Sequence, residues 1–322
     1  MKQRTVIITG SNSGIGKAAT QKFAGEGHTV IMACRSLEKS RPVRDQIAKE
    51  SGNNRVYLEE LDMGSFESIR TFCSNFHEKY KDLDVLIHNA AYFNHGAPYK
   101  QSPDGIEITF ATNVAGPFLM TMLLRDLLAQ SDDARILHAG SNIIKHFLNP
   151  KKEIDFDHLQ KEPADPRSHS VYINYRNSKM ALLMLTFRLA KELADSGIKT
   201  YSIQINGATM SKDALMKVKP HWRLIARIQN LFFRPPEFTA DLYYKICTSD
   251  RYNKTTGAHF NHKLEIMKPA RVGAGIITDI KQGFGADVYP AYALNEIVSE
   301  KVWNTCNELT LFHKQQEKRS VF

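Results

Sequence analysis

The stretch Thr9–Ala18, "TGSNSGIGKA", directly follows the apolar run Val6–Ile8. A strand, a glycine turn and a helix that begins near Gly14 would bring free backbone N–H groups and the positive end of a helix to one point. Gly10 permits the tight turn, Gly14 lets a ligand approach the backbone, and Gly16 lets helix and strand pack closely. The stretch therefore predicts a pyrophosphate site, although a turn of this kind can also use glycine for backbone reasons alone.

Outward from this turn, apolar runs of strand length alternate with helix-like stretches. The predicted strands are Thr5–Thr9, His28–Cys34, Arg55–Leu61, Leu83–His88, Arg135–Ala139 and Lys199–Ile205. Leu37–Ser51 and Ser65–Tyr80 are examples of the predicted helices. This alternation predicts an α/β fold, a doubly wound parallel sheet of the Rossmann type.

No repeat, low-complexity tract or Pro/Gly/Ser-rich linker divides the 322 residues, so we expect one domain. Within it we expect a cofactor-binding and catalytic core over 1–205, a C-terminal helical substrate lid with the last strand over 206–265, and a C-terminal extension over 266–322. The uncharged stretch Ile108–Leu124 contains a glycine and a proline, and we expect it to form a buried helix of a soluble domain.

The cysteines and the N-terminus bear on compartment. Cys34, Cys73, Cys247 and Cys306 are far apart and have no metal-ligand spacing. They predict free thiols, no metal site and a cytoplasmic protein. The N-terminus shows no signal-peptide pattern.

The formal net charge is +9, and basic residues gather over 212–234. Such an excess is found in nucleic-acid and membrane-binding proteins. No helix-turn-helix, zinc-finger or RNP-like pattern accompanies it, so we expect no nucleic-acid partner.

The glycine pattern resembles that of the short-chain dehydrogenase/reductase family, whose TGxxxGxG is met by Thr9, Gly10, Gly14 and Gly16. The resemblance implies a nicotinamide dinucleotide as cofactor. At the end of the second strand, in "IMACRS", NAD-preferring members carry an acidic residue, whereas this chain has Arg35. Because a guanidinium can hold a 2′-phosphate bidentately and Lys17 adds charge nearby, we expect NADP(H). The alternative is an ordinary solvated arginine.

Further motifs follow in the family's order. Asp62 in "LDM" stands where the family aspartate bonds the adenine, and Asn89, Ala90 and Ala91 match its NNAG with alanine in the last place. Close backbone packing at the crevice is the alternative for these small residues. The residues expected to contact the cofactor are Gly10, Ser11, Asn12, Ser13, Gly14, Ile15, Gly16, Lys17, Arg35, Asp62, Met63, Asn89, Ala90, Ala91, Tyr175, Lys179, Gly207 and Thr209.

"YRNSK" places Tyr175 and Lys179 four residues apart, on one face of a predicted helix. An ammonium about 4 Å from a phenol supplies on the order of 4 kcal/mol. This is nearly enough to lower the pKa of tyrosine from about 10 to about 7. Tyr175 would then act as a proton donor or acceptor at working pH. A surface Tyr–Lys pair is the alternative interpretation.

The resemblance completes a catalytic set with Ser141, which would hold the substrate oxygen, and Asn113, which would lead a water chain to Lys179. Gly140 stands where the family more often has another serine. For Asn113 the alternative is a satisfied buried amide.

"ACR", the chain length and the C-terminal "ALNEIVSEKVWNTCNEL" resemble the retinol dehydrogenase branch, and "NAAYF" is also similar to protochlorophyllide reductases. Against the latter, His88 stands in place of a cysteine. Asn206 replaces the family's usual proline before Gly207. The stretch 220–233 has helical amphipathicity at the position of the family's substrate lid, and peripheral membrane contact is the alternative for it.

These observations predict an NADP(H)-dependent oxidoreductase that moves hydride to or from the carbonyl or alcohol carbon of an apolar substrate, such as a retinoid, steroid, lipid or polyketide. A homo-oligomer is compatible with the sequence. The alternative functions are an NADPH-binding sensor or scaffold without turnover and, third, a basic nucleic-acid binder.

Overall fold

The computed structural model describes residues 2–94, 96–165, 169–210, 215–216, 223, 230, 233–271, 282–283, 285 and 287–311. Seven parallel strands form the main sheet in the order β3-β2-β1-β4-β5-β6-β7. They are β1 (Thr5–Thr9), β2 (Thr29–Cys34), β3 (Val56–Glu60), β4 (Val85–His88), β5 (Arg135–Ala139), β6 (Lys199–Ile203) and β7 (Ala258–Phe260). The doubly wound parallel sheet is confirmed, and β1 and β5 have the predicted bounds.

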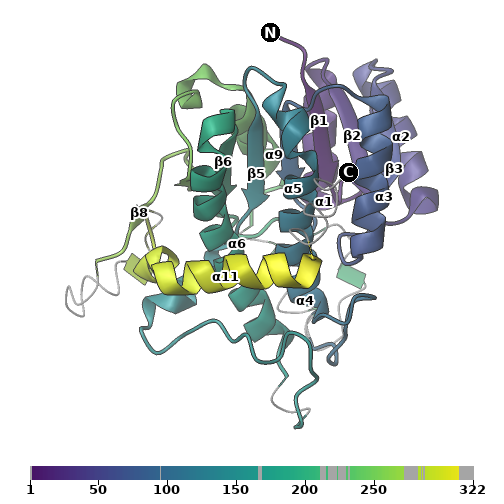
Figure 1. The fold of residues 1–322 in the computed structure, drawn as a ribbon. Helices are drawn as coiled ribbons and strands as arrows, with labels where there is room; N and C mark the ends of the chain where they lie inside the picture. The colour runs from purple at the N-terminus through teal and green to yellow at the C-terminus, as the bar shows by residue number, and fades with distance from the viewer. Residues whose placement is uncertain are drawn as a thin grey trace, which may run out of the picture.

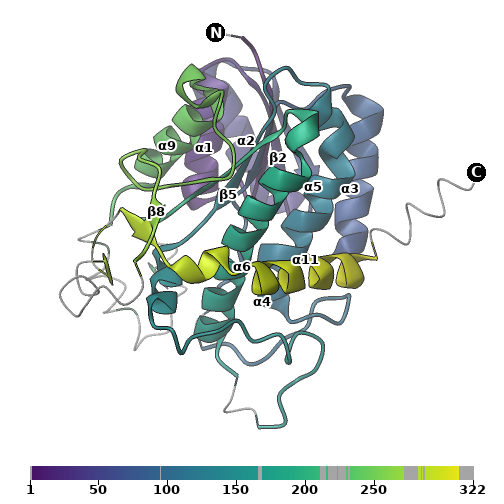
Figure 2. The same ribbon diagram turned by 60° about the vertical axis from the view of Figure 1, so that its left-hand side comes forward.

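Helices cover both faces of this sheet (Figure 2). The longer ones are α1 (Gly14–Gly25), α2 (Leu37–Ser51), α3 (Phe66–Lys79), α5 (Gly116–Ala129), α6 (Val171–Glu192), α9 (Pro236–Thr248) and α11 (Glu296–Thr310). One apolar core joins the sheet to α1, α2 and α9, and the other joins it to α3, α5 and α6. The sheet is therefore buried on both sides, as its unbroken apolar strands require.

Shorter elements complete the described chain. These are α4 (Ile108–Phe110), η1 (Ala111–Ala115), η2 (Asn142–Leu148), η4 (Ala194–Ser196), η5 (Asp250–Tyr252), η6 (Ala291–Leu294) and the small parallel pair β8 (Lys268–Pro269) and β9 (Val288–Tyr289). The predicted buried helix over Ile108–Leu124 exists, but η1 interrupts it with a turn of π-helix. Such turns are rare in proteins overall, and those that occur are often found at functional sites.

The C-terminal helix α11 lies across α6 and α5 (Figure 1). The Trp303 ring packs edge-on against Phe118 with centroids 5.1 Å apart, and Arg188 Nη1 donates to Glu300 Oε2 at 2.7 Å. These contacts join α11 to the core on the α5–α6 side. Most of the predicted lid helix over 220–233 lies outside the described residues.

Two further findings concern the predictions about compartment and membrane. Among the helices of the described chain, none has the length and apolarity to cross a bilayer. Cys34, Cys73, Cys247 and Cys306 are all buried and unpaired, as free thiols were predicted to be.

Candidate active site

A groove runs along the carboxyl ends of the strands. It lies beside the switch point between β1 and β4, where successive strands stop being added on one side of β1 and begin to be added on the other. It has two parts. The larger, about 950 Å³, is lined by the β1–α1 turn, and the smaller, about 580 Å³, by the ends of β5 and β6 and by α6. Ile15, Asn89 and Ala91 line both parts, so the two are continuous.

The glycine turn has the predicted geometry. Gly10 and Gly14 have φ of +64° and +53°, which side-chain-bearing residues rarely adopt. A Cβ on Gly16 would overlap the Gly10 carbonyl oxygen and lie 2.6 Å from Asn89 Nδ2, whereas one on Gly14 would meet nothing within 4 Å. Helix α1 begins here, and the side chain of its N-cap residue Ser13 makes no capping hydrogen bond. Its amino end is thus open to an anion at Gly14 and packed tightly at Gly16.

The structure places most of the predicted cofactor residues along this groove. Lining it are Gly10, Asn12, Ser13, Ile15, Gly16, Arg35, Asp62, Met63, Asn89, Ala90, Ala91, Tyr175, Lys179 and Gly207. Ser11, Gly14, Lys17 and Thr209 do not line it. Ser11 is fully buried with its Oγ 3.2 Å from Cys34 Sγ, and Thr209 N donates to the Arg234 carbonyl oxygen at 3.0 Å.

The cations at the end of β2 differ from the prediction in one respect. Arg35 lines the larger part of the groove, as expected. Lys17 does not, because its Nζ donates to Gln46 Oε1 on α2 at 3.2 Å. Lys39, in the first turn of α2, lines the groove together with Arg35. The second positive charge beside Arg35 is therefore that of Lys39 in this conformation.

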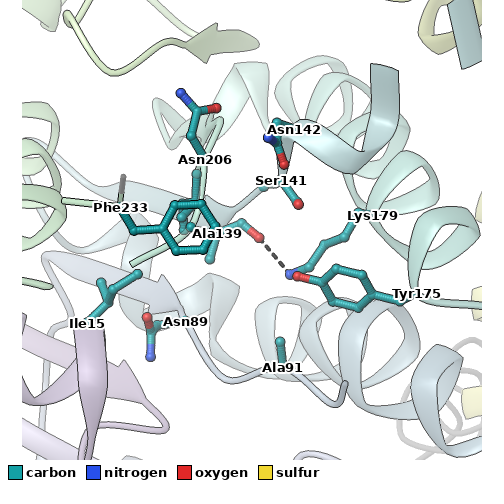
Figure 3. Close-up of a pocket in the computed structure, with 13 residues that line it drawn as sticks. Ile15, Asn89, Ala91, Ala139, Ser141, Asn142, Tyr175, Lys179, Asn206 and Phe233 are labelled. Carbon is teal, nitrogen blue, oxygen red and sulfur yellow. Dashed lines mark hydrogen bonds between the residues drawn. The ribbon is translucent and has the colours of Figure 1, made fainter. Parts of the chain in front are cut away.

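Ser141, Tyr175 and Lys179 converge on the smaller cavity (Figure 3). Ser141 follows β5 after one residue, Gly140, and is 8 % exposed, and its hydroxyl interacts with the Tyr175 phenol. Lys179 is 3 % exposed, and its Nζ donates to the Ala139 carbonyl oxygen at 2.7 Å. Helix α6 and the end of β5 thus bring together three groups that are well separated in the sequence.

The expected effect of Lys179 on Tyr175 is not what the structure shows. Burial raises the pKa of Tyr175, and its hydrogen bond with Ser141 only partly opposes that rise. Lys179 Nζ lies 5.5 Å from the centroid of the phenol ring. Burial also lowers the pKa of Lys179 to about 8. The prediction that Lys179 alone nearly brings Tyr175 to 7 is therefore wrong for this conformation, because it left out the desolvation of the phenol.

Asn113 does not line the cavity. Its Oδ1 accepts from Tyr92 N at 2.7 Å, and its Nδ2 donates to Tyr92 O at 3.2 Å and to Ser178 Oγ at 3.0 Å. It lies within the π-helical turn η1 and is 1 % exposed. Its side chain is a satisfied buried amide that fixes the loop after β4 against the first turns of α6.

Packing explains the glycine before Ser141. A Cβ on Gly140 would lie 2.7 Å from the Ile203 carbonyl oxygen, 2.9 Å from Ser202 Oγ and 3.3 Å from the ring of His259. The neighbouring strands have filled the space that a side chain would need. Glycine in place of the family's more usual serine at position 140 therefore does not displace Ser141.

Several cavity residues were absent from the predicted site. Phe233 covers Gly207, whose φ is +104° and on which a Cβ would lie 2.7 Å from the Phe233 ring. Phe93 packs on Tyr175 with ring centroids 4.6 Å apart. Asn142 and Asn206 also line the cavity. Only Asn206 gave a signal in the sequence, as the replacement of the family's proline.

Comparison with known proteins agrees with this geometry. The family model described as short chain dehydrogenase matches residues 4–147. Human retinol dehydrogenase 11 is 32 % identical over 258 residues, which cover 80 % of this chain and 77 % of that protein. The chain belongs to the short-chain dehydrogenase family. Human retinol dehydrogenases 13 and 14 are each 30 % identical to this family member, over 80 % and 81 % of its length and 76 % and 78 % of theirs.

Solved structures of other proteins share the fold. A protein from Shigella flexneri complexed with NADP superposes with a TM-score of 0.61, at 22 % identity, over 82 % of this chain and 98 % of that one. A protein from Mycobacterium paratuberculosis gives 0.64 at 23 % identity, over 96 % and 93 % of the two chains. Short-chain dehydrogenases are oxidoreductases that bind a nicotinamide cofactor, and the open amino end of α1 and the continuous groove fit such a group.

Proposed function

We propose that this short-chain dehydrogenase is an NADP(H)-dependent oxidoreductase acting on a carbonyl or alcohol group of an apolar substrate. The observation that carries the proposal is the convergence of Ser141, Tyr175 and Lys179 on a cavity continuous with the groove at the glycine turn. A protein that only binds a dinucleotide has no need of a buried lysine and a phenol–hydroxyl pair at the end of that groove.

The bound nicotinamide supplies or accepts the hydride. Ser141 orients the substrate oxygen by a hydrogen bond, and Tyr175 gives it a proton in reduction or takes one in oxidation. One of the three N–H groups of the Lys179 ammonium donates to the Ala139 carbonyl oxygen, which fixes the ammonium near the phenol. The other two N–H groups are left for ribose hydroxyls and Tyr175. Because the bare site raises the pKa of Tyr175, we propose that the positive charges of Lys179 and of the oxidised cofactor together favour its ionised form.

The preference for NADP(H) is supported by Arg35 and Lys39 at the end of the groove beyond β2. Two cations at this point fit the 2′-phosphate of NADP(H). Arg35 stands where a carboxylate would accept hydrogen bonds from the free ribose diol of NAD(H). The structural neighbour from Shigella flexneri was solved with NADP, in agreement with this assignment.

The substrate class is supported by the cavity and by the relatives. Ile15, Ala91, Ile205 and Phe233 give the smaller cavity an apolar wall. The relatives of about 30 % identity are named as retinol dehydrogenases. Four buried free thiols are consistent with a reducing compartment such as the cytoplasm, which we propose as its location.

The test is NADPH oxidation by the purified protein with a panel of apolar aldehydes and ketones that includes retinal, alongside NADH. The wild type should turn over members of the panel with NADPH. Tyr175→Phe should lose about 10²- to 10⁴-fold in kcat, because the proton donor is gone, while its NADPH affinity stays within about twofold.

Tyr201→Phe is the matched control, since Tyr201 is a fully buried tyrosine on β6 whose hydroxyl donates to the Tyr252 and Thr255 carbonyl oxygens and which does not line the cavity. The alternative is an NADPH-dependent sensor without turnover. Binding of NADPH with no oxidation across the panel would favour that alternative. A Tyr175→Phe variant that oxidises NADPH as fast as the wild type would instead refute Tyr175 as the proton donor.

A further inference from the structure

The smaller cavity has an apolar wall and, opposite the nucleotide groove, a polar one. Asn142 and Asn206 lie on one side of it, while Asn89 and Ala91, which it shares with the larger part of the groove, lie on the other side (Figure 3). The two carboxamides are therefore on the substrate side of the cavity.

Backbone geometry places the two asparagines, both of them exposed, close together on the rim of the cavity. Asn142 follows Ser141, and its N–H donates to the Ile205 carbonyl oxygen at 3.1 Å, across the ends of β5 and β6. Asn206 is the next residue after Ile205. Both side chains thus belong to the rim that also carries Ser141, the group proposed to hold the reacting oxygen.

A buried side chain orients one of them. Gln204 is 3 % exposed, and its Nε2 donates to Asn206 Oδ1 at 3.1 Å. Burying a glutamine costs free energy unless its polar groups are hydrogen-bonded, and of the two side-chain groups only Nε2 has a partner among the described residues, whereas Oε1 has none. With Oδ1 engaged, Asn206 has its Nδ2 hydrogens to offer, and its contact with His262 Nδ1 at 3.5 Å is at the limit of a hydrogen bond. The side-chain carboxamide of Asn142 has no hydrogen-bond partner within the described part of the chain.

We infer that Asn142 and Asn206 are specificity-determining residues that bind a second oxygen acceptor on the carbon next to the reacting carbonyl. The substrate is then an apolar molecule with adjacent oxygen functions, such as a vicinal diketone or an α-hydroxyketone, and not a simple monocarbonyl. This inference rests on the proposed function. In the reaction the carbonyl carbon gains a hydride and its oxygen a proton, while NADPH becomes NADP⁺.

The test compares 1-phenyl-1,2-propanedione with propiophenone, which lacks the second carbonyl. The diketone is intrinsically more reactive, so the quantity measured is the ratio of the two kcat/KM values in each variant divided by the same ratio in the wild type. Asn142→Leu and Asn206→Leu keep a similar volume and remove the amide. Each should lower the ratio about tenfold or more, because a cavity built to donate to an oxygen loses its preference with the donor.

Asn75→Leu, an exposed asparagine on α3, is the control and should leave the ratio unchanged. NADPH affinity is measured for each variant. Ratios unchanged within twofold, or a loss confined to NADPH affinity with equal effects on both ketones, overturn the inference. Wild-type reduction of simple apolar aldehydes with neither ketone reduced overturns it and leaves the proposed function standing. No reduction of any carbonyl compound overturns both.

Discussion

The two ends of the groove are built from different parts of the chain. At the β1–α1 end the binding surface is backbone, and its geometry depends on glycines at which a side chain is strained or sterically excluded. At the β5–α6 end it is made of side chains, including a lysine that is 3 % exposed with a pKa lowered to about 8. Adding a single methyl group to a glycine can therefore abolish binding at the first end. The second end is maintained at a cost in folding free energy, because it buries the Lys179 ammonium.

The strongest test of that difference is Lys179→Met. At pH 7 the buried ammonium is charged in both the folded and the unfolded chain, and the lowered pKa corresponds to about 3 kcal/mol against folding. We expect the variant to lose at least about 100-fold in turnover and to gain up to about 3 kcal/mol in its free energy of unfolding at pH 7.

The pH dependence follows from the same group. Between about pH 8 and 10.5 the folded wild type has released this proton and the unfolded chain has not, so wild-type stability rises with pH over that range. Lys179→Met should lack this contribution. Urea unfolding at pH 7 and pH 9.5 measures both effects, with Lys245→Met on α9 as an exposed control. Destabilisation of Lys179→Met at pH 7 would contradict the comparison.

At the backbone end, Gly16→Ala should mainly damage folding. The added Cβ would overlap the Gly10 carbonyl oxygen and crowd Asn89, and overpacking against backbone costs about 1–3 kcal/mol. We expect a correspondingly lower free energy of unfolding and weakened NADPH binding. Calorimetry with and without NADPH measures both. A variant as stable as the wild type would show that α1 shifts freely on the sheet.

Gly14→Ala separates binding from folding. Its φ of +53° makes alanine cost about 1–2 kcal/mol, but the Cβ would meet nothing in the protein and would stand at the open amino end of α1. We expect about tenfold weaker NADPH binding or more. Gly52→Ala has similar strain, φ +62°, and equally open surroundings at the end of α2. It should lose the same stability without any change in NADPH affinity, and equal affinity losses in both variants would refute a phosphate site at Gly14.

The last expected effect is confined to one of the two cofactors and lies at the edge of the backbone end. Arg35→Ala should weaken NADPH binding about 10- to 100-fold, the value of a charge-assisted hydrogen bond, and leave NADH binding nearly unchanged. Fluorescence titration with both cofactors measures the difference. Arg41→Ala, an exposed arginine on α2, controls for overall charge. Equal losses for NADPH and NADH would remove the proposed selectivity.

Local patterns account for most of the fold and for the order of the site residues. Strands β1 and β5 and helix α2 have the predicted bounds, because each is an unbroken apolar or helical run between turn or capping residues. The resemblance to the family's motifs likewise selected Ser141, Tyr175 and Lys179, which the structure brings together. It did not show that Asn113 lies in a π-helical turn with its amide on Tyr92, because that bond joins segments 21 residues apart.

The sequence by itself determined the parallel α/β fold and the glycine turn, because strand periodicity and glycine conformation are local properties of the chain. Tertiary structure alone decided the surroundings of each group. It placed Lys39 in the groove instead of Lys17, put Phe233 over Gly207, and buried Tyr175 so that its pKa rises. Desolvation and contact depend on which distant segments fill the neighbouring space, and no spacing along one chain contains that information.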